Sequence, residues 1–170
     1  HEVNKYLQYN KPKNNENVFV PFNTNKKIVN GMIYSIGPDM RRELEFTVED
    51  QQIIYYIYED CIRKIIDYNN DIKNTEKITC FRVTLVSSSI YAPVYPEDDN
   101  YKVFLKDLVQ IILNSLLKTC LSKDNTYLKT LLFQSADKMK IMPILDSYKI
   151  GMKINNNDKI PELKYQTKEY

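Results

Sequence analysis

Three consecutive serines form the stretch of this sequence best suited to bind a phosphate group. Ser87-Ser88-Ser89-Ile90-Tyr91 directly follows an apolar run that ends at Val86. Short hydroxylated side chains let main-chain N–H groups approach an anion while the hydroxyls donate hydrogen bonds to it. Tyr91 could then cover a ribose or a base. The structural alternative is a polar exit from a strand, with Tyr91 packed on a neighbouring loop, because serine runs are common in loops.

Other chemistries lack the residues that they need. His1 is the only histidine, so this chain cannot assemble a histidine-based metal centre, catalytic triad or general base. The cysteines Cys61, Cys80 and Cys120 are widely spaced in apolar stretches, which argues against a zinc site or a disulfide framework. Asp39 and the acidic run 97–99 occupy turn and helix-capping positions. We therefore assign no metal, no cofactor and no catalytic residue.

Composition and charge restrict the class of protein and of partner. The chain has 170 residues, of which 43% are hydrophobic, enough for one domain with its own core. Lys and Arg number 24 against 22 Asp and Glu, and this near balance argues against a nucleic-acid partner. No apolar run approaches the ~20 residues that a bilayer requires. We expect no membrane association and an intracellular location, cytoplasmic or nuclear. Arg41-Arg42 could meet a phosphate, or could be a solvated pair.

Helices and strands alternate along the middle of the chain. Thr47 with Asp50 three residues later resembles a helix-capping box, and apolar residues then repeat at helical spacing from Ile53 to Ile66. A second apolar helix follows the acidic run and ends near Cys120. Strands are predicted at 17–22, 31–36, 78–86 and 127–133. This order predicts an α/β domain over residues 18–150 with a mainly parallel central sheet, between a polar N-terminal segment (1–17) and a polar C-terminal tail (151–170).

Two motifs in this order resemble the macrodomain family, whose members bind ADP-ribose. The stretch Met32-Ile33-Tyr34-Ser35-Ile36-Gly37-Pro38 is similar to the family's strand of the form V-I-H-x-V-G-P. The stretch from Ser87 to Ala92 is similar to its S-T-G-I-Y/F-G strand end, and Tyr58 matches an aromatic residue of the intervening helix. The resemblance covers about residues 18–137. It implies a three-layer fold with helices flanking a mainly parallel sheet.

The resemblance also implies a binding site. Ser87, Ser88, Ser89, Ile90 and Tyr91 would hold the diphosphate and distal ribose, chiefly through backbone amides. Residues 135–137 (Ser135, Ala136 and Asp137) would lie near the adenine. The implied partner is ADP-ribose or an ADP-ribosylated protein.

This sequence departs from the family pattern in two places. Ser89 stands where the family has glycine, so a Cβ is added where the backbone must approach the ligand. The strands and glycine-rich loop that precede the first motif in the family have no counterpart in this sequence. Three explanations are open: the chain is a fragment, a partner chain supplies the missing strands, or the site has degenerated.

Two functions follow from these matches and departures. The first is a macrodomain-like module that binds ADP-ribose or a related nucleotide through the Ser87–Tyr91 loop. It would act as an ADP-ribosyl hydrolase only if the missing N-terminal half is supplied elsewhere. The alternative is a degenerate macro-like domain that serves a structural or protein-interaction role without binding nucleotide.

Overall fold

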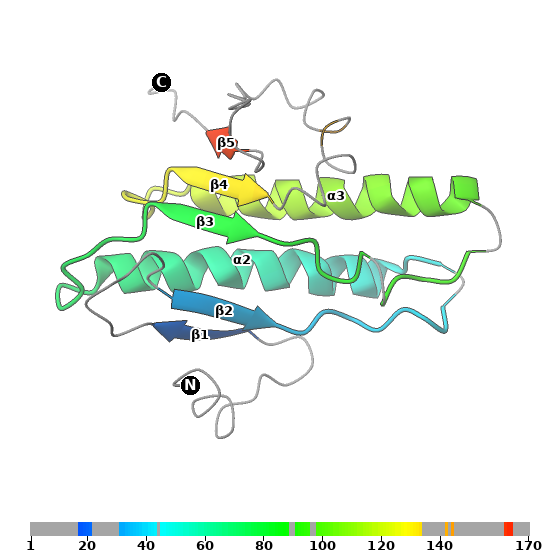
Figure 1. Cartoon of the computed structure of the whole chain (residues 1–170), viewed down its shortest axis with the longest axis horizontal. Helices are drawn as coiled ribbons and strands as arrows, with labels where there is room; N and C mark the ends of the chain where they lie inside the picture. The colour runs from blue at the N-terminus through cyan, green and yellow to red at the C-terminus, as the bar shows by residue number, and fades with distance from the viewer. Residues whose placement is uncertain are drawn as a thin grey trace.

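Two long helices and five short strands make up the secondary structure that the computed structural model describes (Figure 1). The residues described are 17–21, 31–43, 45–88, 91–95, 98–133, 142, 144 and 162–164. In chain order the elements are β1 (Asn17–Pro21), β2 (Gly31–Ser35), α2 (Val48–Asn70), β3 (Cys80–Val83), α3 (Asp98–Cys120), β4 (Thr130–Phe133) and β5 (Glu162–Lys164). Helices and strands thus occur together, and the α/β class predicted from the sequence is confirmed.

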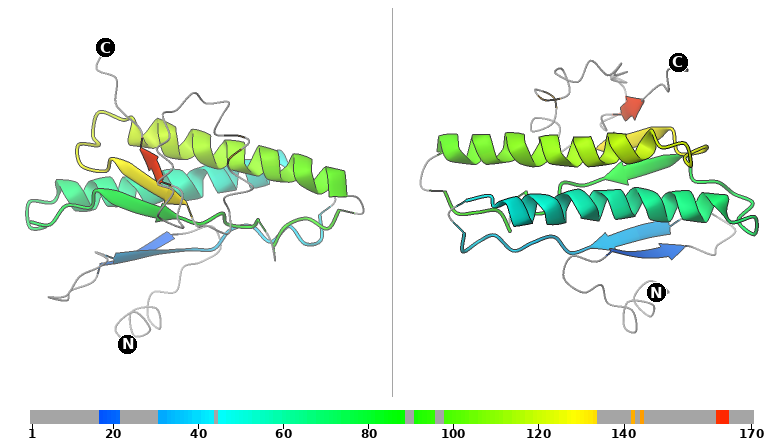
Figure 2. Two further views of the ribbon diagram at one scale, coloured as in Figure 1. Left: turned by 45° about the horizontal axis from the view of Figure 1, so that its top comes forward. Right: turned by 180° about the vertical axis from the view of Figure 1, so that it is seen from behind.

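The strands form two separate sheets. β1 pairs with β2 in antiparallel orientation, with Asn17 opposite Ser35. β3 pairs with β4 in parallel orientation, with Cys80 opposite Thr130, and β4 pairs with β5 in antiparallel orientation. β3, α3 and β4 therefore form a βαβ unit. Figures 1 and 2 show α2 and α3 side by side, on the same side of both sheets.

This arrangement differs from the single, mainly parallel sheet that the sequence predicts. Among the described strand pairs, β3–β4 alone is parallel, and β2 and β3 belong to different sheets. The predicted strands are also longer than those observed: 78–86 shortens to Cys80–Val83, and 127–133 shortens to Thr130–Phe133. In the segment predicted as a polar tail, Glu162–Lys164 forms a strand. The rest of that tail, and residues 1–16, lie outside the described residues.

A helix side chain bonds the segment that follows β3. β3 ends at Val83, where its pairing with Phe133 of β4 also ends. Tyr58 Oη donates to the Thr84 carbonyl (2.5 Å) and accepts from the Val86 N–H (2.9 Å). The tyrosine hydroxyl thus joins two backbone groups just beyond the end of β3 to α2.

The core lies between the two helices and the sheets. Thr47 caps α2 as predicted, since its hydroxyl accepts a hydrogen bond from the Asp50 N–H (3.2 Å). The apolar stripe of α2 is buried where the sequence predicts it, through Ile54, Ile57, Tyr58, Cys61, Ile62, Ile65 and Ile66. α3 contributes the fully buried Phe104, Leu108, Ile112, Leu113 and Leu116. Burial of each such side chain stabilises the fold by about 2 kcal/mol.

Polar side chains attach the middle of α2, residues 55–60, to its neighbours. Asn17 of β1 donates its amide to the Ile57 carbonyl (2.7 Å) and to the Asp60 carboxylate (2.9 Å). Ser115 of α3 donates its hydroxyl to the Tyr55 carbonyl (2.6 Å). Together with Tyr58, these bonds fix the helix relative to β1, α3 and the chain beyond β3.

Two buried asparagines set where β3 and β4 begin. The Asn69 amide donates to the Ile78 carbonyl (2.9 Å) and its oxygen accepts from the Ile78 N–H (2.6 Å). Asn125 bonds Leu128 in the same way, at 2.9 and 3.0 Å. Each side chain thus acts as a strand partner for one residue just ahead of a strand. We call these two side chains the asparagine clamps.

Replacement of Asn69 by alanine tests the first clamp. Asn69→Ala leaves both backbone groups of Ile78 without their side-chain partner in a buried position, so we expect a loss of about 3 kcal/mol in the free energy of unfolding. Urea denaturation followed by circular dichroism measures this loss. Asn70→Ala is the matched control, because Asn70 is exposed at the same helix end, and it should change stability by less than about 0.5 kcal/mol. Equal effects of the two substitutions would contradict the clamp.

Candidate functional site

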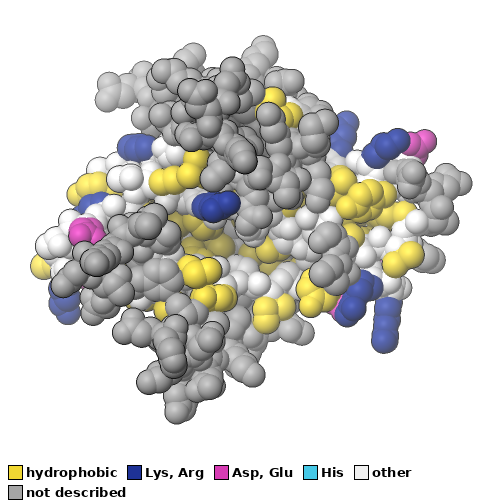
Figure 3. Space-filling view, in the orientation of Figure 1, with side chains coloured by type: hydrophobic (Ala, Val, Ile, Leu, Met, Phe, Trp, Pro, Cys, Tyr) yellow, Lys and Arg dark blue, Asp and Glu magenta, His cyan; other side chains and the backbone are white. Residues whose placement is uncertain are grey.

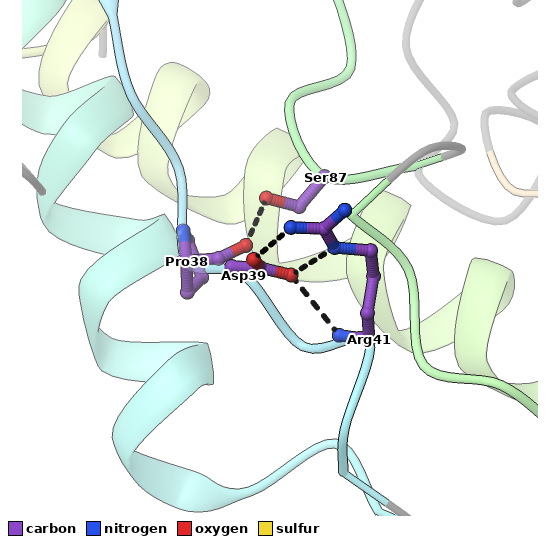
Figure 4. Close-up of polar contacts among 4 residues, drawn as sticks. All are labelled: Pro38, Asp39, Arg41 and Ser87. Carbon is purple, nitrogen blue, oxygen red and sulfur yellow. Dashed lines mark hydrogen bonds and ion pairs between the residues drawn. The ribbon is translucent and has the colours of Figure 1, made fainter.

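The chain segments that leave β2 and β3 meet beyond the ends of their strands. The Ser87 hydroxyl donates to the Pro38 carbonyl (2.8 Å), as Figure 4 shows. The Met40 N–H donates to the Tyr91 carbonyl (3.0 Å). The two motifs singled out from the sequence are therefore neighbours in space, although their strands are not paired. We call the surface formed by residues 38–42, 87, 88 and 91 the exit surface.

Close packing at Gly37 makes this contact possible. A Cβ at position 37 would overlap the Ser87 hydroxyl and lie 3.3 Å from the Val86 Cβ. Ser87 itself has a φ of 56°, in the left-handed region that non-glycine residues adopt at a cost. Its hydrogen bond to Pro38 holds this conformation. Gly37 and Ser87 together determine how closely the two exits approach.

The serine hydroxyls face inward, unlike the anion-binding arrangement expected from the sequence. Ser87 is 8% exposed and Ser88 is 5% exposed. Ser87 donates to Pro38, and Ser88 donates to the Leu85 carbonyl (2.9 Å). The Ser88 carbonyl in turn accepts a hydrogen bond from Tyr101 Oη of α3 (2.8 Å). These two serines therefore link strand exits and helices through hydrogen bonds within the chain.

Several residues implied by the resemblance lie outside the described residues. Ser89 and Ile90, in the middle of the loop, are among them, as are Ser135, Ala136 and Asp137. Tyr58 is described, and its ring lies on the buried face of α2 with the hydroxyl at the Thr84–Val86 edge. Through these two hydrogen bonds, Tyr58 holds the chain segment that leads into the loop.

An arginine, a tyrosine and an aspartate form the outward-facing part of the exit surface. Tyr91 is 45% exposed, and the Arg41 guanidinium lies 5.1 Å from the centre of its ring. Arg41 Nε donates to Asp39 Oδ1 (2.7 Å), and Arg41 Nη2 contacts Asp39 Oδ2 (2.5 Å) (Figure 4). Arg42 is exposed beside them. The sequence suggested Arg41 as a phosphate contact but contained no sign of its stacking on Tyr91.

No family model, curated protein or solved structure matches this chain. Function must therefore be argued from the site itself.

The electrostatics of the exit surface are dominated by the ion pair. Hydrogen bonds from Arg41 lower the pKa of Asp39 to about 2 from its ordinary value of 3.8, and the charge of Arg42 acts in the same direction. Asp39 also accepts from the Arg41 N–H (3.3 Å), which is the turn role that the sequence predicts for it. Arg41 is thus held in one orientation over the Tyr91 ring.

A second acidic group near this surface is missed by sequence reasoning. The pKa of Glu43 is raised, chiefly by a hydrogen bond with Asp50 and then by burial. Asp50 is buried at the start of α2 and accepts a hydrogen bond from the Thr47 hydroxyl. Glu43 and Asp50 are seven residues apart, and the Thr47–Asp50 capping box gives no sign that Glu43 lies beside it, so only the fold brings them together. Among the described residues, no group of His, Cys, Asp and Glu side chains could hold a metal ion.

No described helix has the length and apolar character needed to cross a bilayer.

Removal of the Tyr58 hydroxyl tests its hydrogen bonds to the segment that leads into the loop. Tyr58→Phe keeps the aromatic ring but removes the hydroxyl that bonds the Thr84 carbonyl and the Val86 N–H. We therefore expect a loss of about 2 kcal/mol in the free energy of unfolding. Urea denaturation measures this loss, and amide hydrogen exchange at Val86 should become faster. Tyr56→Phe is the control because Tyr56 is 62% exposed. If hydrogen exchange at Val86 were unchanged, this role of Tyr58 would be incorrect.

Titration of Asp39 tests the ion pair. Its carboxyl pKa is lowered in the folded protein, so the pair contributes to stability above pH 4 and this contribution is lost as the pH falls toward 2. NMR titration of the Asp39 side-chain carbon should give a midpoint of about 2. In Arg41→Gln the midpoint should rise toward 3.8. A midpoint that Arg41→Gln does not move would exclude the pair in solution.

Proposed function

We propose that this chain is a macrodomain-like module that binds ADP-ribose or a related nucleotide at the exit surface. In this proposal the diphosphate contacts Arg41 and the backbone of the Ser87–Tyr91 loop, and Tyr91 packs against a ribose or base. The proposal extends to the family's three-layer fold, of which the described residues contain two separate sheets with α2 and α3 on one side. It retains ADP-ribosyl hydrolysis only as an activity that would need residues not assigned in this chain.

The observation that carries the proposal is the stacked pair of Arg41 and Tyr91 beside the loop. A guanidinium presents a planar set of N–H donors that fits the oxygens of a phosphate. An exposed tyrosine ring offers an apolar face to a sugar or base while its hydroxyl stays in water. The hydrogen bonds between the two exits hold these groups next to each other. A ligand would therefore meet both groups without reordering the backbone that carries them.

Asp39 sets the strength of such binding. Its carboxylate already occupies two nitrogen atoms of Arg41, at 2.7 and 2.5 Å. An incoming phosphate must compete with this carboxylate, and the two negative charges repel each other. Asp39 therefore weakens the binding of an anion, and it orients the Arg41 guanidinium when no ligand is bound.

A second function is favoured by the serine hydroxyls. Because Ser87 and Ser88 are buried and donate to backbone carbonyls within the chain, they bind no ligand in this arrangement. This is what a degenerate macro-like domain with a structural or protein-interaction role requires. The two functions differ in one measurable property, which is affinity for the nucleotide.

Calorimetric titration with ADP-ribose decides between them. Under the first function we expect saturable heat, about tenfold weaker affinity in Arg41→Gln, and about fivefold tighter affinity in Asp39→Asn, since that substitution removes the competing charge. Arg63→Gln is the matched control, because Arg63 is also an exposed arginine in an ion pair, with Glu59 on α2. No heat at millimolar ADP-ribose with a folded sample would refute nucleotide binding and leave the second function.

A further inference from the structure

An open cavity of about 480 Å³ lies at the surface where α3 begins, and no residue of the exit surface lines it. Its apolar lining comes from Phe46, Tyr95, Val103 and Phe104, and Asn100 and two carboxylates, Glu45 and Asp107, also border it. Figure 3 shows hydrophobic side chains exposed at this end of the molecule. Nothing in the function proposed above uses these residues.

Three aromatic rings pack against one another along the lining of the cavity. The ring centre of Phe104 lies 5.1 Å from that of Phe46 at an angle of 83°. The Tyr95 ring lies 5.9 Å from Phe104 and is tilted by 46°. Phe104 is 2% exposed, whereas Phe46 and Tyr95 are partly buried, so Phe46 and Tyr95 are the rings that a ligand in the cavity would contact.

The charges around the rings are negative. Glu45 and Asp107 are both exposed, and neither forms an ion pair with another described residue. Burial raises the pKa of Tyr95, and the charges of Asp107 and Glu45 raise it further, so both carboxylates act on the same hydroxyl. No lysine or arginine is among the lining residues described. Asp107 lies beyond the first turn of α3, where the positive end of the helix dipole has little effect.

We propose that this cavity binds a quaternary ammonium group, carried either by a trimethylated lysine side chain or by a small cation such as choline. Aromatic faces attract a cation within about 6 Å of the ring centre. A quaternary ammonium needs no hydrogen-bond acceptor, which suits the apolar part of the lining that Phe46, Tyr95 and Val103 offer. The two carboxylates supply long-range attraction, and Val103, which is 59% exposed, offers apolar surface for the aliphatic stem.

NMR titration of the full chain with three probes tests this proposal. The probes are choline, a short peptide with one trimethyllysine, and 3,3-dimethylbutan-1-ol, which has the shape of choline without its charge. We expect the cations to shift the Phe46, Tyr95 and Val103 signals with dissociation constants in the millimolar range or tighter, and the neutral alcohol to bind at least about tenfold more weakly. Tighter binding of the peptide than of choline would identify methylated lysine as the source, and the reverse would identify the small cation.

Two variants separate charge from simple apolar binding. The exposed double variant Glu45→Gln/Asp107→Asn should weaken choline binding about fivefold without changing the fold. Asp99→Asn is the matched control: Asp99 is an exposed carboxylate on the same helix, paired with Lys102 outside the cavity lining, and its loss should leave the affinity unchanged. Equal affinity for choline and the neutral alcohol, or no shifts at about 50 mM of either cation, would overturn the proposal.

Discussion

The hydroxyl of Tyr58 is the constraint on which the exit surface depends. By bonding both the Thr84 carbonyl and the Val86 N–H, it joins α2 to the chain just beyond β3. β2 pairs with β1 in a separate sheet, and the chain that leaves β2 contacts that same segment through the bond between Ser87 and Pro38. A helix side chain thus holds the segment against which the β2 exit packs, and the exit surface lies where the two segments touch.

The buried face of α2 performs two tasks at once. Its isoleucines supply apolar area, while Tyr58 and the backbone carbonyls of Tyr55 and Ile57 make polar contacts with β1, α3 and the β3 exit. Buried polar groups are costly unless they are paired. Because each of these groups has a hydrogen-bond partner, α2 has one favoured rotation about its axis and one favoured position along that axis relative to the sheets. The positions of Arg41 and Tyr91 depend on this placement of α2.

The helices could be predicted from the sequence, but the strand pairing could not. Helical spacing from Ile53 to Ile66 and the Thr47 cap are local signals, and they locate α2 correctly. Strand partners depend on contacts between segments distant in the chain, and in the same way nothing near Tyr58 in the sequence identifies Thr84 as its partner. The roles of Asn69 and Asn125 are hidden for a similar reason, since asparagine near a helix end also fits an ordinary turn.

For the candidate site, the sequence indicates the two strand exits but not the contacts between them. The Gly37-Pro38 turn and the serine run indicate strand exits, and the structure brings them together. The direction of the Ser87 and Ser88 hydroxyls depends on a left-handed φ and on carbonyls elsewhere in the fold, neither of which a run of three serines encodes. The Arg41–Tyr91 stack has the same origin, because it joins two loops fifty residues apart in the chain.

The asparagine clamps also have a consequence for the order of folding. Asn69 and Ile78 are separated by 9 positions along the chain, whereas Ser115 and Tyr55 are separated by 60. Closing a short loop costs less entropy and is faster than closing a long one. During synthesis on the ribosome, α2 and the start of β3 can therefore associate before α3 has emerged. Until then the isoleucine stripe of α2 is without its partner helix, and this is the interval in which the nascent chain would benefit most from a chaperone.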